Sequence, residues 1–142
     1  MSRISILVFV ASPLDYARYR HAALYIQYDD AEIKSSVAEV VGTTGFYSYS
    51  ERVNWEIPVL STNLARTVPV STISESIPAS ALREIISQTP IPNTEMDDWN
   101  SQDWVSDALG RLVEIGCLDE SARDTALDGM VNAVLEAGDE EV

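Results

Sequence analysis

One histidine and one serine stand at the starts of two predicted secondary-structure elements. His21, the single histidine of the chain, precedes the apolar run Ala22–Tyr28. Imidazole is the side-chain group that ordinarily titrates near neutral pH, so His21 is the candidate for a general base. A lone histidine is also common as an ordinary surface or core residue, and on its own it does not define a catalytic site.

Ser101 lies in the first turn of the clearest predicted helix, which covers residues 101–115. Backbone N–H groups at a helix start have no partner within the helix, and the positive end of the helix dipole favours negative charge there. A nucleophile at this position would have part of an oxyanion site already built. A serine near a helix start is, however, more often a cap.

Glu39 interrupts the otherwise apolar end of the run Ser36–Val41. A carboxylate in such a setting needs a polar partner, because burying an unpaired charge is costly. Glu39 could therefore orient His21. An exposed sheet edge, or the outer face of a sheet, would explain the residue equally well.

The elements that must position these residues are strands in the first half of the chain. The run at the N-terminus is almost continuously apolar, which is typical of a strand buried on both faces. Turn residues at 42–45 lead into the stretch 46–50, where aromatic residues and serines intermingle. Pro69 cannot donate to a sheet ladder, so its strand is expected at an edge or an end. The predicted strands cover residues 4–10, 22–28, 36–41 and about 66–70.

The second half is predicted to be helical. The middle helix has Asn100 as a suitable N-cap and Gly116 as a suitable stop, and its apolar residues, including Trp104, recur on one face. The predicted helices cover residues 78–87, 101–115 and 121–137, and the last is expected to turn inward Ala126, Leu127, Met130, Val131 and Val134.

Taken together, these segments resemble a known family. The chain resembles small fungal proteins of the permuted NlpC-type, papain-like superfamily in three segments. These are His21 before an apolar strand, then Gly42-Thr43-Thr44-Gly45-Phe46, then Trp99-Asn100-Ser101-Gln102-Asp103-Trp104-Val105 at a helix start. In those proteins the histidine strand precedes the nucleophile helix. The resemblance spans roughly residues 20–116. It implies an α+β fold in which an antiparallel sheet packs against helices, and a hydrolase or acyltransferase.

The same resemblance implies roles for individual residues. His21 would be the base, Glu39 the third polar member, and Gln102 and the Ser101 N–H would lie near the oxyanion. The family's nucleophile is a cysteine, and Ser101 stands at that position. A thiol paired with imidazole can ionise near neutral pH, whereas a serine hydroxyl must lose its proton during attack. Three interpretations stay open: a true Ser-His-Glu site, a decayed and inactive site, or an engineered Cys-to-Ser form.

Aromatic residues could line a substrate cleft around this site. Trp99, just before the helix and beside Ser101, is the one expected to touch a ligand, with Trp55, Tyr47 and Tyr49 as further candidates. Trp104 is expected in the core from its position on the helix. Cys117 follows the helix stop and is expected to be a small buried hydrophobe, so it does not replace the missing nucleophilic thiol.

Composition narrows the function classes. The 142 residues, 46% of them hydrophobic, predict a single domain over 1–142 with a short acidic C-terminal tail. A formal net charge of -14 argues against nucleic acid and anionic membrane surfaces as partners. One cysteine and one histidine argue against a disulfide or a zinc site, and a reducing, cytoplasmic location is favoured. A metal held by carboxylates alone stays open, although no loop of spaced aspartates with a central glycine is present, and no metal or other cofactor is expected.

Three functions fit these observations. The first is a papain-like enzyme that attacks an amide, ester or thioester of a small-molecule or peptide substrate through His21 and Ser101, which predicts that the two side chains converge within hydrogen-bond reach. The second is a catalytically inactive binding module of the same fold. The third is a tailoring enzyme of small-molecule biosynthesis that uses the cleft for cyclisation or condensation.

Overall fold

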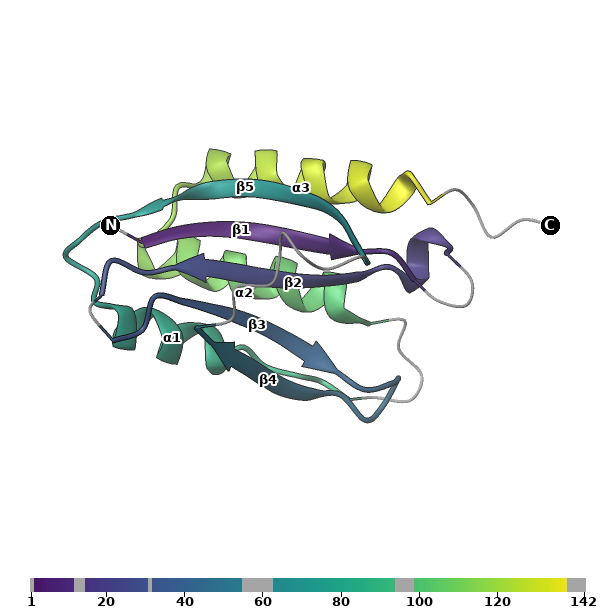
Figure 1. Cartoon of the computed structure of the whole chain (residues 1–142), viewed down its shortest axis with the longest axis horizontal. Helices are drawn as coiled ribbons and strands as arrows, with labels where there is room; N and C mark the ends of the chain where they lie inside the picture. The colour runs from purple at the N-terminus through teal and green to yellow at the C-terminus, as the bar shows by residue number, and fades with distance from the viewer. Residues whose placement is uncertain (1, 12–14, 31, 55–62, 94–98, 138–142) are drawn as a thin grey trace.

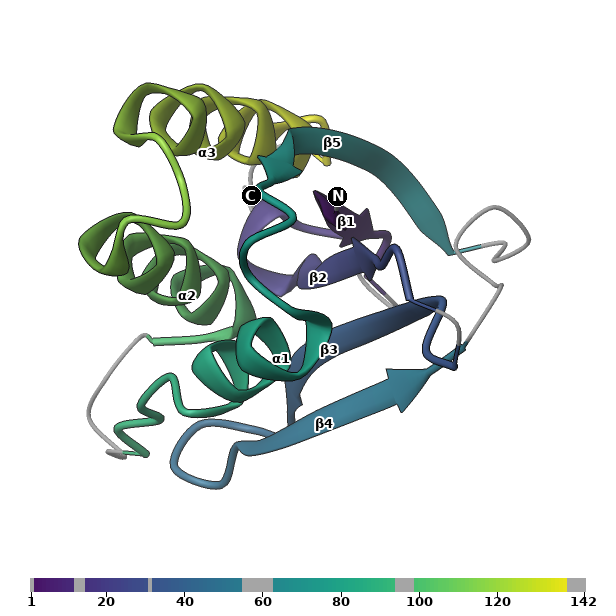
Figure 2. The same cartoon turned by 90° about the vertical axis from the view of Figure 1, so that its left-hand side faces the viewer.

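The computed structural model describes residues 2–11, 15–30, 32–54, 63–93 and 99–137. These residues form one five-stranded sheet with three helices on one of its faces, as the two perpendicular views show (Figures 1 and 2). The α+β class predicted from the sequence is confirmed. The strands are β1 Ser2–Phe9, β2 His21–Gln27, β3 Ser35–Val41, β4 Ser48–Val53 and β5 Leu64–Ile73; the helices are η1 Ala17–Tyr19 (a 3₁₀ turn), α1 Ala79–Ser87, α2 Ser101–Ile115 and α3 Glu120–Leu135.

The sheet has the strand order β4-β3-β2-β1-β5, and every neighbouring pair is antiparallel. The four predicted strands are all present, with boundaries within a few residues of those expected. Pro69 lies in the edge strand β5, opposite Ser5, next to an irregularity in the register between Ile4 and Ser5. A proline is tolerated there because an edge strand has one side without ladder partners.

The tight turn between β3 and β4 depends on glycine. Gly42 has a φ of 122°, and a Cβ placed on it would approach the carbonyl oxygen of Phe46 to 2.5 Å. Gly45 also has a positive φ, of 85°. These two backbone positions let β4 fold back along β3, so the aromatic and serine stretch becomes a strand.

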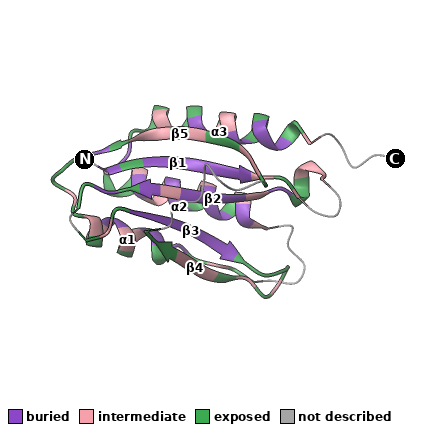
Figure 3. Ribbon diagram, in the orientation of Figure 1, coloured by how far each residue is buried: buried purple, intermediate pink, exposed green. Residues whose placement is uncertain are grey.

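The main core lies between the sheet and the helices, where alternate residues of the strands meet α2. Side chains of β1 at Ile4, Ile6 and Val8 pack there with Trp104 and Leu109 of α2. The remaining side of β1 is buried too, since Leu7 forms a smaller apolar cluster with Ala23 and Val37 on the other sheet face. Figure 3 shows β1 as an almost uniformly buried strand, as its continuous apolar run predicts.

Helix α3 corrects one detail of the sequence prediction. Val131 was expected to face inward but is 49% exposed, whereas Ala133 is buried at 4% exposure. Ala126, Met130 and Ala133 follow the spacing of one helix face, and Val131 lies about 100° away from Met130 around the helix axis. The expectations for Ala126, Met130 and Val134 are confirmed, and Leu127 is partly buried against the core.

Candidate active site

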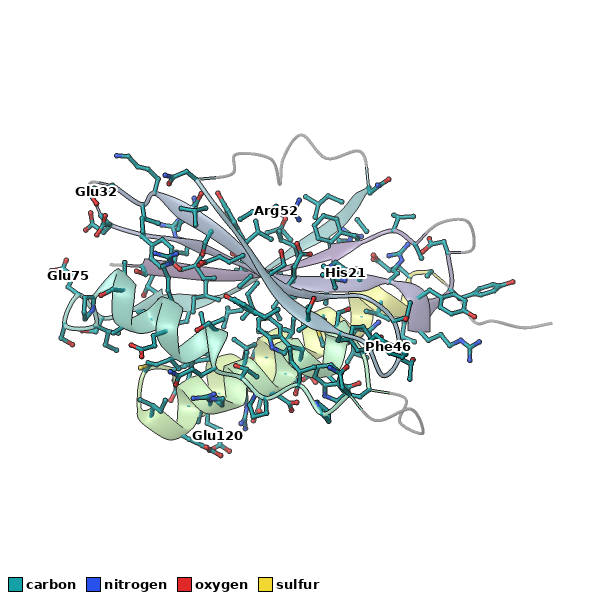
Figure 4. The ribbon with its side chains drawn as sticks, turned by 90° about the horizontal axis from the view of Figure 1, so that it is seen from below. His21, Glu32, Phe46, Arg52, Glu75 and Glu120 are labelled. Atoms are coloured by element: carbon teal, nitrogen blue, oxygen red, sulfur yellow. The ribbon has the colours of Figure 1, made fainter. Side chains whose placement is uncertain are left out.

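Three side chains from three adjacent strands form a line of hydrogen bonds on the sheet. His21, the first residue of β2, places Nε2 2.6 Å from Oε1 of Glu39 in β3. The second carboxylate oxygen of Glu39 accepts from Nη2 of Arg52 in β4 at 2.7 Å. Figure 4 shows His21 and Arg52 on the sheet above the helix layer. Glu39 therefore has the partner that its apolar surroundings demand.

Glu39 is held as a carboxylate between these two neighbours. Its side chain is only 6% exposed. Burial raises the pKa of Glu39, but the hydrogen bond from His21 and the charges of His21 and Arg52 outweigh it, so the pKa lies below its usual value. An ionised carboxylate is a pure acceptor, so the bond requires the proton on Nε2 of His21. In the neutral ring, Nδ1 is then the nitrogen with a free lone pair and can act as a base.

Arg52 is the member of this group that the sequence analysis missed. Arg52 lies in β4 directly opposite Val37 of β3, and Val37 precedes Glu39 by two residues. Arg52 is therefore the diagonal cross-strand neighbour of Glu39 and can reach its carboxylate. The sequence feature that could have pointed to Arg52 is a basic residue in the strand that follows the one carrying Glu39. Using that feature requires the hairpin register, which the glycine turn sets.

Ser101 is the first residue of α2, and its surroundings define a helix start of the expected kind. Asn100 is the N-cap, and its side-chain oxygen accepts from the Gln102 N–H at 2.9 Å. Asp103 completes a capping box by accepting from the Asn100 N–H. Because Asn100 caps the helix, Ser101 is not needed as a cap. Its hydroxyl points elsewhere.

The Ser101 hydroxyl lies beside the backbone of His21. Its Oγ accepts a hydrogen bond from the N–H of Ala22, the next residue along β2, at 3.1 Å. Ser101 is buried, at 6% exposure, yet it contributes to the lining of the same cavity as His21 and Glu39. The fold thus brings together three residues that lie 18 and 62 positions apart in the chain.

That cavity has a volume of about 630 Å³. Its volume falls within the usual range of ligand pockets. His21 and Ser101 both line it, but the described residues contain no direct hydrogen bond between them, so the close contact expected from the sequence is not formed in this state. The lining includes His21, Glu39, Gly42, Tyr47, Ser50, Arg52, Asn100 and Ser101, together with residues 18–20 of the segment before β2.

Gln102 has a different role from the one expected. Its Nε2 donates to the carbonyl oxygens of Ala17 at 3.0 Å and Arg20 at 2.9 Å. The Asn100 amide adds a third tie, to the carbonyl of Arg18 at 3.3 Å. Because both Nε2 protons of Gln102 are already donated, its amide holds η1 and the start of β2 against α2 instead of facing an oxyanion. The resemblance also implies the Ser101 N–H as an oxyanion donor, and that group lies in the first turn of α2.

Trp99 lies in a second hollow, of about 370 Å³, that adjoins the first. Tyr47 and Trp99 line it, with their ring centroids 5.5 Å apart in an edge-to-face arrangement. Trp104 is fully buried, as predicted, and packs against Tyr49 at 5.8 Å between centroids, so these two rings belong to the core. Trp55 lies outside the described residues.

Cys117 is partly buried against the core, and burial raises the pKa of its thiol. Neither of the two hollows just described has Cys117 in its lining. Within the described residues, no group of three or more His, Cys, Asp or Glu side chains is arranged to hold a metal ion. Over the same residues, no helix is both long and apolar enough to cross a membrane.

Comparison with known proteins assigns the chain to a family. A family of unknown function, DUF6540, matches residues 8–119. The chain belongs to this family. The matched DUF6540 region includes His21, Glu39, Arg52 and Ser101, and so the whole of the candidate site. No curated protein and no solved structure shows a significant match.

Proposed function

We propose that this DUF6540 protein is a papain-like enzyme of the permuted NlpC type that transfers or hydrolyses acyl groups. The observation that supports the proposal is the Glu39–His21 hydrogen bond of 2.6 Å beside a serine at a helix start, all within one cavity. A base oriented by a third group, next to a nucleophile, is the arrangement shared by covalent acyl-transfer enzymes.

In the proposed mechanism, Nδ1 of His21 takes the proton of the Ser101 hydroxyl while Oγ attacks the carbonyl carbon of an amide, ester or thioester. Glu39 stabilises the imidazolium that forms, and Arg52 positions Glu39 by binding its second oxygen. The tetrahedral oxyanion meets the Ser101 N–H and the positive end of α2. His21 then gives its proton to the leaving group, and water or another acceptor releases the acyl group. Cyclisation or condensation of a biosynthetic intermediate would use the same acyl-enzyme.

The Ala22 N–H has a defined part in this scheme. It donates to the very oxygen that becomes the nucleophile, at 3.1 Å. A donor at that position stabilises negative charge on Oγ as the proton leaves, in the same way that a thiolate would be stabilised in the cysteine enzymes that the chain resembles.

A second candidate function is a binding module that has kept the fold and lost the chemistry. One observation favours it: Ser101 Oγ bonds to a backbone amide and makes no direct bond to His21 within the described residues. Catalytic hydrogen bonds are often long before substrate binds, so both candidates are consistent with this geometry.

Labelling with an alkyl fluorophosphonate separates the two candidates. An activated serine displaces fluoride and keeps the phosphonyl group, and mass spectrometry of peptides locates it. The enzyme proposal predicts labelling at Ser101, absent in Ser101→Ala and slowed at least about a hundredfold in His21→Ala. A folded parent protein that stays unlabelled at Ser101 would overturn the enzyme proposal in favour of the binding module.

A further inference from the structure

The hollow next to the candidate active site has its own chemical character. Tyr19, Tyr47 and Trp99 line it, together with Arg18, Thr44 and Asn100. Four of these residues, Arg18, Tyr19, Tyr47 and Asn100, also line the cavity that holds His21 and Ser101, so the two hollows are continuous. Three aromatic residues from three separate segments of the chain thus line a hollow that adjoins the cavity lined by Ser101.

We propose that this aromatic hollow is a recognition subsite for an aromatic ring carried by the acyl substrate. That the ring belongs to an acyl substrate rests on the proposed acyl-transfer function. The binding of an aromatic ring in the hollow does not depend on that function. The hollow of about 370 Å³ lies within the size range of small-ligand pockets, and with the adjoining cavity it can hold a ring and a reactive carbonyl together.

The walls of the hollow are fixed before any ligand binds. The backbone of Tyr47 is clamped by the side chain of Asn93, which accepts from the Tyr47 N–H at 2.7 Å and donates to its carbonyl at 2.9 Å. The Trp99 indole donates to Asp107 of α2 at 3.2 Å. These bonds fix the backbone of Tyr47 and the indole of Trp99, so less conformational freedom is lost when a ligand binds.

The third wall is held in the same way. Tyr19 belongs to η1, and η1 is tied to α2 by the amides of Asn100 and Gln102. Tyr19 is 46% exposed, and the guanidinium of Arg18 lies over its ring at 4.8 Å and donates to its hydroxyl at 2.7 Å. This third aromatic residue thus lines the hollow with one ring face covered by Arg18.

The geometry favours an aromatic ring over an aliphatic group of equal size. Tyr47 and Trp99 meet edge to face at an interplanar angle of 72°, so their two ring planes are steeply inclined to each other. A planar ring can stack on one ring and meet the edge of the other, and such aromatic pairs attract each other beyond the effect of the area buried. An aliphatic group gains only the burial.

Two alkylating probes of nearly equal size test this inference on a Ser101→Cys variant: N-benzyl-iodoacetamide and N-cyclohexylmethyl-iodoacetamide. Their rate ratio at residue 101, divided by the ratio for free cysteine in solution, isolates recognition of the planar ring. The inference predicts a normalised benzyl preference of about two- to tenfold. Peptide mass spectrometry separates residue 101 from Cys117.

Variants of the hollow sharpen the test. Trp99→Leu and, separately, Tyr47→Leu should bring the normalised ratio to about one. The matched control is Phe46→Leu, because Phe46 is 72% exposed and is not part of the lining of either hollow. A ratio near one in Ser101→Cys, or a preference that survives both aromatic replacements, would overturn the subsite.

A measurement on the parent chain, which carries Ser101, keeps this result apart from the catalytic one. N-benzylacetamide should shift the indole N–H resonance of Trp99, assigned by its loss in Trp99→Leu, and N-cyclohexylmethylacetamide should not. If fluorophosphonate leaves Ser101 unlabelled while the ring preference holds, the function fails and the subsite stands. If Ser101 is labelled and both ring tests fail, the subsite alone is overturned.

Discussion

His21 Nε2 lies 2.6 Å from Glu39 Oε1, and this contact joins β2 to β3 one residue before Ala22, whose N–H donates to Ser101 at the start of α2. The carboxylate is almost fully enclosed, whereas the imidazole is 33% exposed toward the cavity. A buried acceptor thus fixes one nitrogen of the ring and leaves the rest of the ring accessible. This asymmetry is what a general base needs, because one ring nitrogen is held while the rest of the ring faces the cavity.

The first prediction concerns pH and the stability contributed by Glu39. The pKa of Glu39 is lower in the folded chain than its unfolded-state value of 4.5. The ionised carboxylate therefore stabilises the fold fully at pH values above the unfolded-state pKa, and this stabilisation is lost as the pH falls through the folded-state pKa. Glu39→Gln should therefore have a lower free energy of unfolding than the parent at neutral pH, and this difference should become smaller in acid. Urea unfolding between about pH 7 and pH 3 measures the difference. The exposed Glu32→Gln variant is the control and should show no comparable narrowing.

The second prediction compares two Arg–Glu pairs. Arg52→Gln removes a charged donor from the enclosed Glu39 and should cost about 1–2 kcal/mol of unfolding free energy. Arg66 and Glu136 form a bidentate pair at 2.9 and 2.7 Å, but their side chains are 60% and 44% exposed. Arg66→Gln should therefore cost less than about 1 kcal/mol. Equal losses in denaturant titrations would argue that Arg52 does not support Glu39.

The third prediction tests the corrected role of Gln102. Gln102→Met keeps the length of the side chain but removes the two donors that hold Ala17 and Arg20. The segment around η1 should loosen, and amide hydrogen exchange of residues 17–20 should accelerate while α2 stays protected. Unchanged exchange, together with a large loss of fluorophosphonate reactivity, would instead restore Gln102 as an oxyanion donor.

The fourth prediction uses two glycines in opposite surroundings. Gly42→Ala would force a Cβ to 2.5 Å from the Phe46 carbonyl at a φ of 122°, and should cost at least about 1–3 kcal/mol. Gly110 lies within α2 with nothing within 4 Å of an added Cβ, so Gly110→Ala should stabilise by about 0.5–1 kcal/mol. Thermal unfolding of both variants checks the signs. A tolerated Gly42→Ala would mean that the β3–β4 turn can relax.

The prediction of the fold from the sequence succeeded where local signals were strong. Helix α2 begins at Ser101 and ends before Gly116 as predicted, because its cap, its apolar face and its glycine stop agree with one another. The strand β4 was not predicted as such, since its side chains are mostly exposed or half-buried and carry little apolar alternation. Its formation depends on the Gly42 turn and on pairing with β3.

The candidate site shows the same division. His21, Glu39 and Ser101 could be selected from residue type and setting, and all three line one cavity. Arg52 could not, because its contact with Glu39 depends on the register of the β3–β4 hairpin, and the tie made by Gln102 could not, because it joins segments 82 residues apart in the chain. The aromatic hollow was foreseen only in part, through Trp99 and Tyr47.

The most direct test of the central claim is the alkylation rate of the Ser101→Cys variant as a function of pH, with the parent as control for Cys117 and a His21→Ala version beside it. The account predicts that the introduced thiol reacts with an apparent pKa well below the value of about 8.5 for a free cysteine, and that removing His21 abolishes this advantage. A thiol that titrates like an ordinary cysteine in both backgrounds would contradict the claim that His21 and residue 101 form one catalytic site.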